Sequence, residues 1–349
     1  MNKILIIRPS SIGDIVMASG MIRALRDAWP QGYIAWIADP QARDLLIHNP
    51  ELDEVIFWPK DTWKQLFAGG NFYSLGCEIR QFIRNLRQRH FDLAIDATGL
   101  FRSRMMAWLS GAGERVGFES KEPGSMLMTQ ITSRGPDVRN MSSEYADLIH
   151  TLGLSCSDFY PFIVLSSRDQ DAARNKLSAA GLDTGYAALC PFTTRPQKEW
   201  VGERWAELAE RVSAEFNLEV ILLGGPGDIA KGRQIQIISQ NMLLNFCGKT
   251  TLGESAAIIK EASLVIGVDT GLTHMGSAFE RPTVALFGAT CPYLSTFSPK
   301  TIVIYQPHDN CSPCHRRPSC KGTFACMRAI SSAQVFTTAK TLLQTQKTS

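Results

Sequence analysis

The 349-residue sequence has no long hydrophobic run, no strong excess of charge of one sign and no regular pattern of cysteines. No window approaches the roughly 20 apolar residues of a membrane-spanning helix, and the apolar run at residues 3–8 is too short for a signal peptide. The formal net charge of +3 is too small to indicate a nucleic-acid-binding protein. We therefore expect a cytoplasmic protein, with a peripheral contact to a membrane left open.

The nine cysteines give no secretory disulfide pattern, because five of them are scattered. The remaining four, Cys311, Cys314, Cys320 and Cys326, have the spacing C-x2-C-x5-C-x5-C. The first pair has metal-ligand spacing, but the later spacings are not those of a standard zinc finger. A structural zinc, a labile disulfide and free thiols are equally open, and none of them indicates a catalytic role.

The sequence is long enough for two domains, and 44% apolar and 20% charged residues are typical of a globular enzyme. Strand-like runs alternate with helical patterns, which predicts α/β domains with doubly wound parallel sheets. Predicted strands are residues 3–8, 33–38, 54–58, 91–96, 186–190, 218–223, 264–268 and 283–287. The last two are expected to complete the second sheet. The predicted domains are residues 1–165 and 166–330, followed by a terminal helix at residues 331–349 that can pack back across the boundary.

The most informative stretch is residues 264–275, which reads as a buried strand, a tight turn and a helix that begins at Met275. Gly271 lets a ligand approach the backbone, and the amides of Thr270 and Gly271 with the helix dipole favour a phosphate. Asp269 would repel phosphate, so it is better placed to accept hydrogen bonds from sugar hydroxyls. Taken alone, the alternative that Asp269 and Thr273 cap the helix and His274 packs beneath it is equally supported.

A second junction of this kind follows the first strand, where the loop at residues 9–14 precedes a helix. The loop lacks the lysine of a P-loop and the G-x-G-x-x-G of a dinucleotide site, which disfavours an NAD-dependent dehydrogenase. Asp14 lies at the helix N-terminus, where the dipole keeps its carboxylate ionised, as a general base requires. An ordinary first-turn acid is the simpler alternative.

Basic residues gather in the loops after the strand at residues 91–96, and in a parallel sheet these loops share one edge with Asp14. Gly99 lies at the start of these loops. The arginines suit bidentate contacts with carboxylates or phosphates of an acceptor. A solvated basic face is the alternative for each of them. The basic residues are Arg102, Arg104, Arg115 and Lys121.

Two further loops in the second half suit a nucleotide. Thr193, Thr194 and Lys198 follow the strand at residues 186–190 and could clamp a diphosphate, although a solvated turn is the alternative for Lys198. Asp228 follows a glycine-rich turn after the strand at residues 218–223, where an acid commonly holds ribose hydroxyls.

Three motifs together, residues 10–14, 193–198 and 269–274, resemble those of the glycosyltransferase family 9 heptosyltransferases. The resemblance extends over essentially the whole chain. It implies the glycosyltransferase-B fold, with two Rossmann-like domains facing across a cleft. It also implies inverting transfer of a heptose from ADP-heptose to Kdo or heptose in the lipopolysaccharide inner core, without a catalytic metal or a further cofactor.

Residue roles follow from the same resemblance. It makes Asp14 the general base in an N-terminal acceptor-binding domain, and it implies that Lys198 supports departure of the diphosphate. The implied donor contacts are Thr193, Thr194, Lys198, Asp228, Asp269, Thr270, Gly271 and His274. At Asp228 the family pattern carries Glu. The implied acceptor contacts are Ser11, Gly13, Arg102, Arg104 and Lys121.

Two alternatives keep the same architecture. Nothing in the sequence specifies the base of the nucleotide, so a UDP- or GDP-sugar transferase is one of them. The other is a non-catalytic nucleotide-binding protein, against which Asp14 argues, because a binding module needs no carboxylate in that loop.

Overall fold

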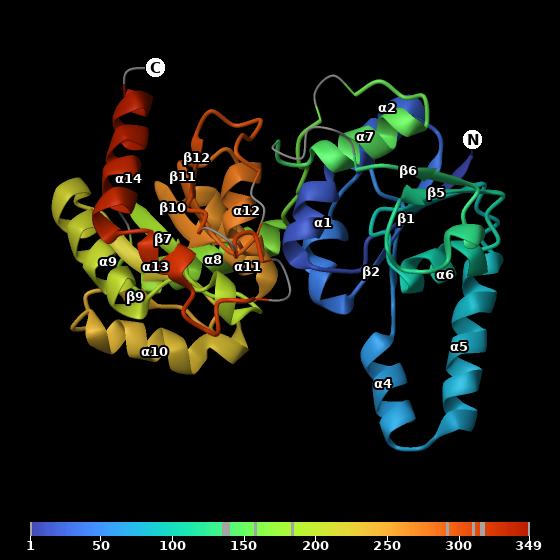
Figure 1. Ribbon diagram of the computed structural model, residues 1–349, viewed down its shortest axis with the longest axis horizontal. Helices are drawn as coiled ribbons and strands as arrows, with labels where there is room; N and C mark the ends of the chain where they lie inside the picture. Colours follow the sequence, from blue (N-terminus) through green and yellow to red (C-terminus); the bar gives the residue numbers. More distant parts are fainter. Residues whose placement is uncertain are drawn as a thin grey trace. The chain divides into compact units, whose positions relative to one another are not determined.

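The structure, a computed structural model, describes residues 2–134, 140–156, 159–182, 185–290, 293–308, 311–314 and 318–347. The chain divides into two compact units (Figure 1). The first unit comprises residues 1–138 and 142–164, and the second comprises residues 139–141 and 165–349.

The first unit contains a six-stranded parallel sheet in the order β3-β2-β1-β4-β5-β6. Its strands are β1 (Lys3–Ile7), β2 (Tyr33–Ala38), β3 (Glu54–Phe57), β4 (Leu93–Asp96), β5 (Glu114–Phe118) and β6 (Gln130–Thr132). The central strand β1 is enclosed on both faces, which explains why Ile4–Ile7 are all apolar and buried. Ile7 pairs with Asp96, so β1 and β4 end together.

Helices cover both faces of this sheet. Ile4 and Ile6 of β1 pack in one cluster with residues of α1, α2 and α7, whereas Leu5 and Ile7 pack in another with residues of α5 and α6. The alternation follows the two-residue period of a strand. The helices are α1 (Ile12–Ala18), α2 (Gly20–Ala28), α3 (Arg43–Leu46), α4 (Lys60–Ala68), α5 (Phe72–Arg87), α6 (Phe101–Leu109) and α7 (Ser143–Thr151), with short 3-10 turns η1 (Pro40–Ala42) and η2 (Ser125–Leu127).

The second unit repeats this topology with a sheet in the order β12-β11-β10-β7-β8-β9. Its parallel strands are β7 (Tyr186–Cys190), β8 (Glu219–Leu222), β9 (Leu244–Asn245), β10 (Leu264–Val268), β11 (Thr283–Phe287) and β12 (Thr301–Tyr305). Numbered by chain order within each unit, both sheets have the strand order 3-2-1-4-5-6 of the Rossmann fold.

The helices of the second unit are α8 (Ser167–Ala179), α9 (Gly202–Phe216), α10 (Ile229–Ile238), α11 (Leu252–Glu261), α12 (Gly271–Ala278), α13 (Ala325–Ala329) and α14 (Ser332–Lys347). Two 3-10 turns, η3 (Pro196–Lys198) and η4 (Pro226–Asp228), follow β7 and β8. The C-terminal helix α14 packs on α9, β11 and β12, and its Val335, Ala339 and Leu342 join the core of this unit.

All eight predicted strands are present, but two expectations about the second unit were wrong. The strand at residues 283–287 does not complete the sheet, because β12 lies beyond it at the edge. The helix after β10 begins at Gly271 rather than Met275. Its first turn was missed because Thr273 and His274 are polar, yet both are buried and hydrogen-bonded.

In each unit the strand order reverses between two central strands, β1 and β4 in the first and β7 and β10 in the second. Ligands of open α/β sheets bind outside the carboxyl ends of the strands at such switch points. Asp14 and Gly99 follow β1 and β4, while Lys198 and Asp269 follow β7 and β10. No helix within the described residues is long and apolar enough to cross a membrane.

Candidate active site

Asp14 lies in the first turn of α1 and is held by both of its carboxylate oxygens. The Arg8 Nη2 atom is 2.7 Å from Oδ1. The backbone amide and the hydroxyl of Ser11 donate to Oδ2 at 3.0 and 2.8 Å. The Asp14 side chain is still 32% exposed, so a substrate hydroxyl can reach it.

These contacts determine the protonation state of Asp14. Burial alone would raise the pKa of its carboxyl group, but the Arg8 charge and the Ser11 hydrogen bonds outweigh burial and lower the pKa below its usual value. The carboxylate is therefore ionised at neutral pH and fixed in orientation. Both properties are required of a group that accepts a proton from a hydroxyl.

Arg8 was not predicted as a site residue. Its side chain is only 8% exposed, its Nη1 donates to the carbonyl oxygen of Ala97 at 2.7 Å, and its guanidinium carbon lies 5.7 Å from the centre of the Tyr145 ring. Arg8 thus ties Asp14 to the loop after β4. The sequence does contain a signal for Arg8: it ends an otherwise apolar buried strand, and a buried charge needs a partner of opposite charge.

The loop after β4 has a defined shape. The amides of Thr98 and Gly99 donate to Oδ1 of Asp96 at 2.9 and 3.1 Å. Gly99 has φ of +79°, and a Cβ there would lie 3.3 Å from Cβ of Phe118. Glycine is required at this position because a side chain would be strained and crowded. Arg134 closes the loop by donating from Nη2 to the carbonyl oxygen of Thr98 at 2.9 Å.

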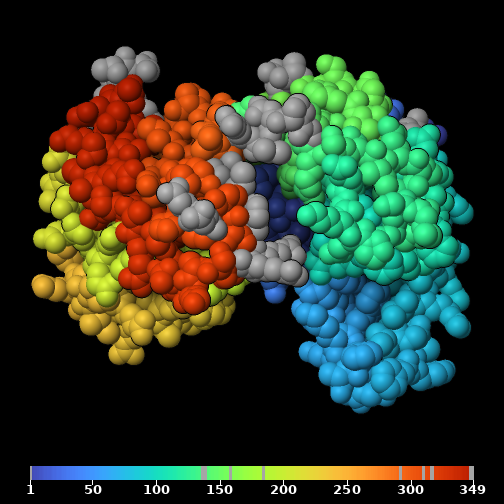
Figure 2. Space-filling view, viewed as in Figure 1, coloured from blue at the N-terminus to red at the C-terminus, as the bar shows by residue number. Residues whose placement is uncertain are grey.

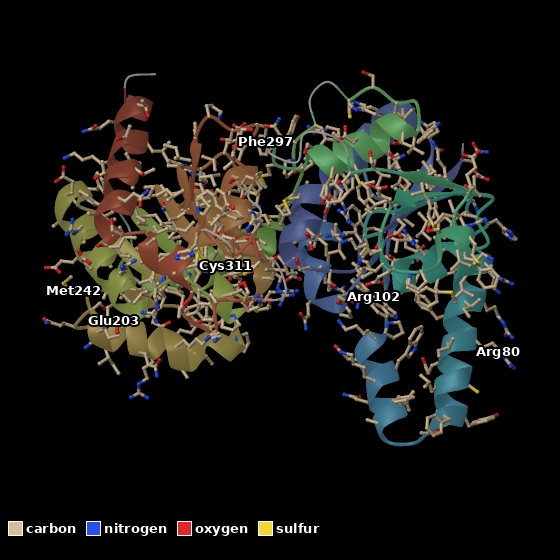
Figure 3. The ribbon with its side chains drawn as sticks, viewed as in Figure 1. Arg80, Arg102, Glu203, Met242, Phe297 and Cys311 are labelled. Carbon is tan, nitrogen blue, oxygen red and sulfur yellow. The ribbon has the colours of Figure 1, made fainter. Side chains whose placement is uncertain are left out.

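The predicted basic residues divide into two groups. Arg102, labelled in Figure 3, and Lys121 are exposed. The Arg102 guanidinium also lies over the Trp58 ring, 5.6 Å from its centre. Arg104 is fully buried and donates to the carbonyl oxygens of Phe118 and Glu122, each at 2.9 Å. Arg115 donates to backbone carbonyl oxygens of its own neighbourhood. In contrast to our expectation, Arg104 and Arg115 stabilise loops, and only Arg102 and Lys121 are available to a ligand.

The central group of the second unit is Asp269, at the end of β10. The ammonium group of Lys198 is 2.6 Å from Oδ2, which also accepts a 2.6 Å hydrogen bond from the Thr290 hydroxyl. The His274 Nε2 atom lies 3.2 Å from Oδ1. Thr290 was not predicted as a contact, because its proximity depends on the path of the loop after β11.

His274 is buried, and its Nδ1 is 2.6 Å from the hydroxyl of Tyr293, another residue that sequence reasoning missed. Because an ionised carboxylate only accepts hydrogen bonds, Nε2–H of His274 donates to Asp269, while Nδ1 shares a hydrogen bond with the Tyr293 hydroxyl. His274 therefore orients Asp269 and is packed beneath it, but Asp269 does not cap the helix, because the N-cap of α12 is Thr270.

The network keeps Asp269 negatively charged. Burial alone would raise the pKa of its carboxyl group, but the hydrogen bond from His274 and the charge of Lys198 lower the pKa far below the usual range. Such a fixed carboxylate can accept hydrogen bonds from hydroxyl groups of a sugar.

An anion can bind beside it at the N-terminus of α12. Thr270 occupies the N-cap without a side-chain hydrogen bond to the helix. The first amides of the helix, beginning at Gly271, are thus available to an external acceptor. A Cβ at Gly267 would lie 2.1 Å from Oγ1 of Thr273. Glycine in the buried strand β10 therefore allows the first turn of α12 to pack closely against it.

The remaining predicted donor contacts lie in loops at the same edge of the sheet. Thr193 is half-buried and Thr194 exposed, and neither hydroxyl has a hydrogen-bond partner in the described part of the chain. Asp228 is half-buried, and its Oδ2 accepts from the Gly225 amide at 2.9 Å. Asp228 therefore holds its own loop, and its role at a ribose stays a prediction.

The four clustered cysteines are free thiols in the structure. Within the described residues, no group of three or more His, Cys, Asp or Glu side chains is arranged to hold a metal ion. Of the three alternatives, the structure shows neither a disulfide nor an assembled metal site at these four positions.

Comparisons with known proteins agree with this arrangement. Residues 79–324 match the sequence profile of glycosyltransferase family 9 (heptosyltransferase). Lipopolysaccharide heptosyltransferase 2 of Escherichia coli is 27% identical over 83% of this chain and 84% of its own length. Lipopolysaccharide heptosyltransferase 1 of Pseudomonas aeruginosa is 24% identical over 90% of this chain and 86% of its own length.

Solved structures share the fold. The ADP-heptose LPS heptosyltransferase II of E. coli superposes with a TM-score of 0.76 at 22% identity and 99% coverage of both chains. A family 9 glycosyl transferase of Veillonella parvula gives 0.78 at 21% identity, covering 98% of this chain and 97% of its own. The predicted α/β glycosyltransferase-B fold is confirmed. The profile match, which covers more than half of the chain, shows that the chain belongs to glycosyltransferase family 9 and is a glycosyltransferase.

Proposed function

We propose that this enzyme is an inverting heptosyltransferase that moves a heptose from ADP-heptose to the inner core, Kdo or heptose, of lipopolysaccharide. The relatives named above are lipopolysaccharide heptosyltransferases. One structural neighbour, the heptosyltransferase WaaC of E. coli, was solved with ADP-2-deoxy-2-fluoro heptose; it has a TM-score of 0.68 at 23% identity and covers 87% of this chain and 93% of its own. The observation that carries the proposal is the Lys198–Asp269–His274 group at the end of β10.

This group suits a sugar diphosphate. Lys198 has three N–H donors, so it can keep its contact with Asp269 and still donate to a phosphate oxygen. The amides at the start of α12 supply further donors to the phosphates. Asp269 accepts hydrogen bonds from hydroxyls of the heptose. Thr193 and Thr194 are the remaining diphosphate contacts, and Asp228 is the ribose contact.

In the proposed transfer step, Asp14 acts on the acceptor and Lys198 acts on the leaving group. Asp14 takes the proton of an acceptor hydroxyl while that oxygen forms a bond to the anomeric carbon. The bond from this carbon to the diphosphate oxygen breaks, and ADP leaves with the bonding electrons. Lys198 and the α12 amides stabilise the negative charge that develops on the leaving diphosphate. Attack opposite to the leaving group inverts the anomeric configuration. No cofactor beyond the donor takes part.

The acceptor is anionic if it contains Kdo, whose carboxylate suits arginine and lysine. Of the basic residues predicted to contact the acceptor, Arg102 and Lys121 are exposed, and Ser11 and Gly13 lie beside Asp14. Because the lipopolysaccharide core is attached to a lipid, the enzyme meets its acceptor as a peripheral protein at the cytoplasmic face of the membrane.

Calorimetric titration with ADP, UDP, GDP and NAD, and then with ADP-heptose, tests the donor. Selective binding of ADP and ADP-heptose supports the proposal, whereas a preference for UDP or GDP would replace the donor and leave the family unchanged. Incubation of bound ADP-heptose with Kdo-containing core acceptors tests the transfer. Binding without transfer to any core acceptor would favour the non-catalytic alternative.

A further inference from the structure

The helical hairpin α4–α5 of the first unit is only slightly buried. No residue of α4 is buried, and in α5 only Leu86 is. The two helices pack on each other, and α5 packs on α6. Figure 1 shows the hairpin extending away from the sheet of its unit, and Figure 2 shows it as a separate lobe of that unit. A hairpin that adds so little to the core requires another explanation for its apolar residues.

Three exposed aromatic side chains, which we call the aromatic tip, lie on either side of its turn: Phe67 at the end of α4, and Phe72 and Tyr73 at the start of α5. Their exposed fractions are 65%, 63% and 84%. The rings of Phe67 and Phe72 contact each other edge to face, with centroids 5.7 Å apart. Exposing the paired rings of Phe67 and Phe72, with Tyr73 next to them in sequence, to water is unfavourable, and exposed apolar patches are typical of sites that bind another apolar surface.

The charge on the hairpin is mainly positive. Its helices contain five basic residues, Lys60, Lys64, Arg80, Arg84 and Arg87, and two acidic residues, Asp61 and Glu78. Arg80, Arg84 and Arg87 share one face of α5, because they are spaced four and three residues apart. Arg80 and Arg84 are exposed and form no ion pair within the described residues. Figure 3 shows Arg80 on the outer side of α5, pointing away from α4.

The order of these groups along α5 resembles the order of layers in a bilayer surface. Arg80 and Arg84 follow Phe72 by eight and twelve residues, or about 12 and 18 Å along the helix axis. Amphipathic segments insert about 5–10 Å into the boundary between headgroups and acyl chains. With the aromatic tip at that depth, Arg80 lies at the level of the lipid phosphates and Arg84 lies just above them.

We propose that the α4–α5 hairpin is the membrane-docking element of this enzyme and that it binds the surface of a bilayer containing anionic lipids. The aromatic tip inserts below the headgroups, and the arginine face of α5 contacts the phosphates. A bilayer is favoured over a protein partner because the apolar residues form the projecting end of a hairpin and the adjoining charge complements anionic lipid. The inference rests on the proposed function in one respect: docking brings the enzyme to an acceptor that is attached to a lipid.

Sedimentation of the full-length protein with vesicles tests this directly, without donor or acceptor. The probes are phosphatidylcholine vesicles and vesicles of phosphatidylcholine with phosphatidylglycerol. We expect binding to the second kind, weakening as salt is added. Equal binding to both kinds, or binding to neither, would overturn the proposal.

Variants locate the surface. Arg80→Glu with Arg84→Glu should reduce the partition constant on anionic vesicles at least roughly 25-fold, since each removed basic residue accounts for about fivefold. Tyr73→Ser alone and the triple change Phe67→Ser, Phe72→Ser, Tyr73→Ser should also weaken binding, the triple change more strongly. All of these side chains are exposed, so the fold should persist.

The helix α10 of the second unit offers a matched control, because Ile237 is 61% exposed and Arg233 is also exposed. Ile237→Ser and Arg233→Glu should bind vesicles as the wild type does. If they lose binding to the same extent as the hairpin variants, docking is not specific to α4–α5. Transfer to a delipidated core acceptor should be unchanged in the hairpin variants. If the wild type binds vesicles but transfers no heptose, the proposed function fails and the docking element stands.

Discussion

The guanidinium group of Arg8 lies 2.7 Å from the carboxylate of Asp14, and Arg8 also binds the backbone after β4. One residue therefore lowers the pKa of Asp14 and connects the two central loops of the first sheet. The position of Asp14 depends on this pair as much as on the helix that carries it. Arg8 is thus a positioning residue for the proposed base.

Replacing Arg8 should shift the pH dependence of transfer. The pKa of Asp14 is lowered in the native protein, so the base is lost only when the pH falls below the usual carboxylate range. Arg8→Gln removes the positive charge and raises that pKa, which moves the acid limb of the kcat/KM profile to higher pH. Arg8→Lys keeps a charge and should move the limb less. An acid limb that stays in place in a folded Arg8→Gln protein would mean that another group is the base.

Asp14→Asn should abolish most of the turnover and leave the donor site intact. Loss of a general base costs about 10²–10⁴-fold in rate. The affinity for ADP, measured by calorimetry, should stay within about twofold, because the proposed ADP contacts all belong to the second unit. Asp27→Asn, at an exposed acid on α2, is the control and should behave as the wild type does. A loss of ADP binding in Asp14→Asn would instead place Asp14 in the donor site.

Lys198→Ala should weaken ADP binding and spare adenosine, which has no diphosphate. A hydrogen bond to a charged group contributes about 1.5–3 kcal/mol, so the ADP dissociation constant should rise roughly 10- to 150-fold. Lys198→Arg should retain part of the affinity. Isothermal calorimetry with ADP and with adenosine separates the loss of a diphosphate contact from a general structural effect. Unchanged ADP affinity would show that Lys198 does not contact the diphosphate, and equal losses for ADP and adenosine would show that the substitution disturbs the donor site as a whole.

Arg104 and Arg102 are two residues apart on α6, but replacing them should have different effects: one on stability and the other on acceptor binding. Arg104→Leu removes the donor to the buried carbonyl oxygen of Phe118 and to the partly buried carbonyl oxygen of Glu122, so the free energy of unfolding should fall by about 3 kcal/mol in urea titrations. Arg102→Leu should change stability by less than about 0.5 kcal/mol and raise KM for an anionic acceptor. An Arg104→Leu protein with unchanged stability and a raised acceptor KM would restore the acceptor role first expected of Arg104.

Much of the fold could be predicted because buried parallel strands are short apolar runs. β2 and β7 match their predicted residues throughout. β5 was missed because it begins with Glu114 and Arg115 and looks polar, and β9 because it has only two residues. The edge strand β12 is mostly half-buried, so it adds little to the core pattern.

The site could be predicted where a residue lies close after the end of its strand: Asp269 follows β10 directly, and Asp14 lies in the first turn of the helix after β1. Thr290 and Tyr293 were not predicted, because their contacts with Asp269 and His274 depend on the loop after β11. Arg102 and Arg104 could not be separated from the sequence, since the difference depends on which side of α6 faces η2 and β5. A helical residue and its second neighbour point in different directions.

The short segment at residues 140–141 has a consequence for recombination between relatives. The chain reaches the second unit at this segment, returns to the first, and leaves it again after residue 164. Asn140 bridges to Ser295, and the Met141 amide donates to the Ser295 carbonyl oxygen at 2.9 Å. A gene crossover between residues 164 and 165 would exchange the second sheet but keep the old segment 140–141. A viable chimera would therefore need a loop around residue 295, taken from the relative, that still pairs with Asn140 and Met141. The two units can thus be exchanged less freely than their repeated topology suggests.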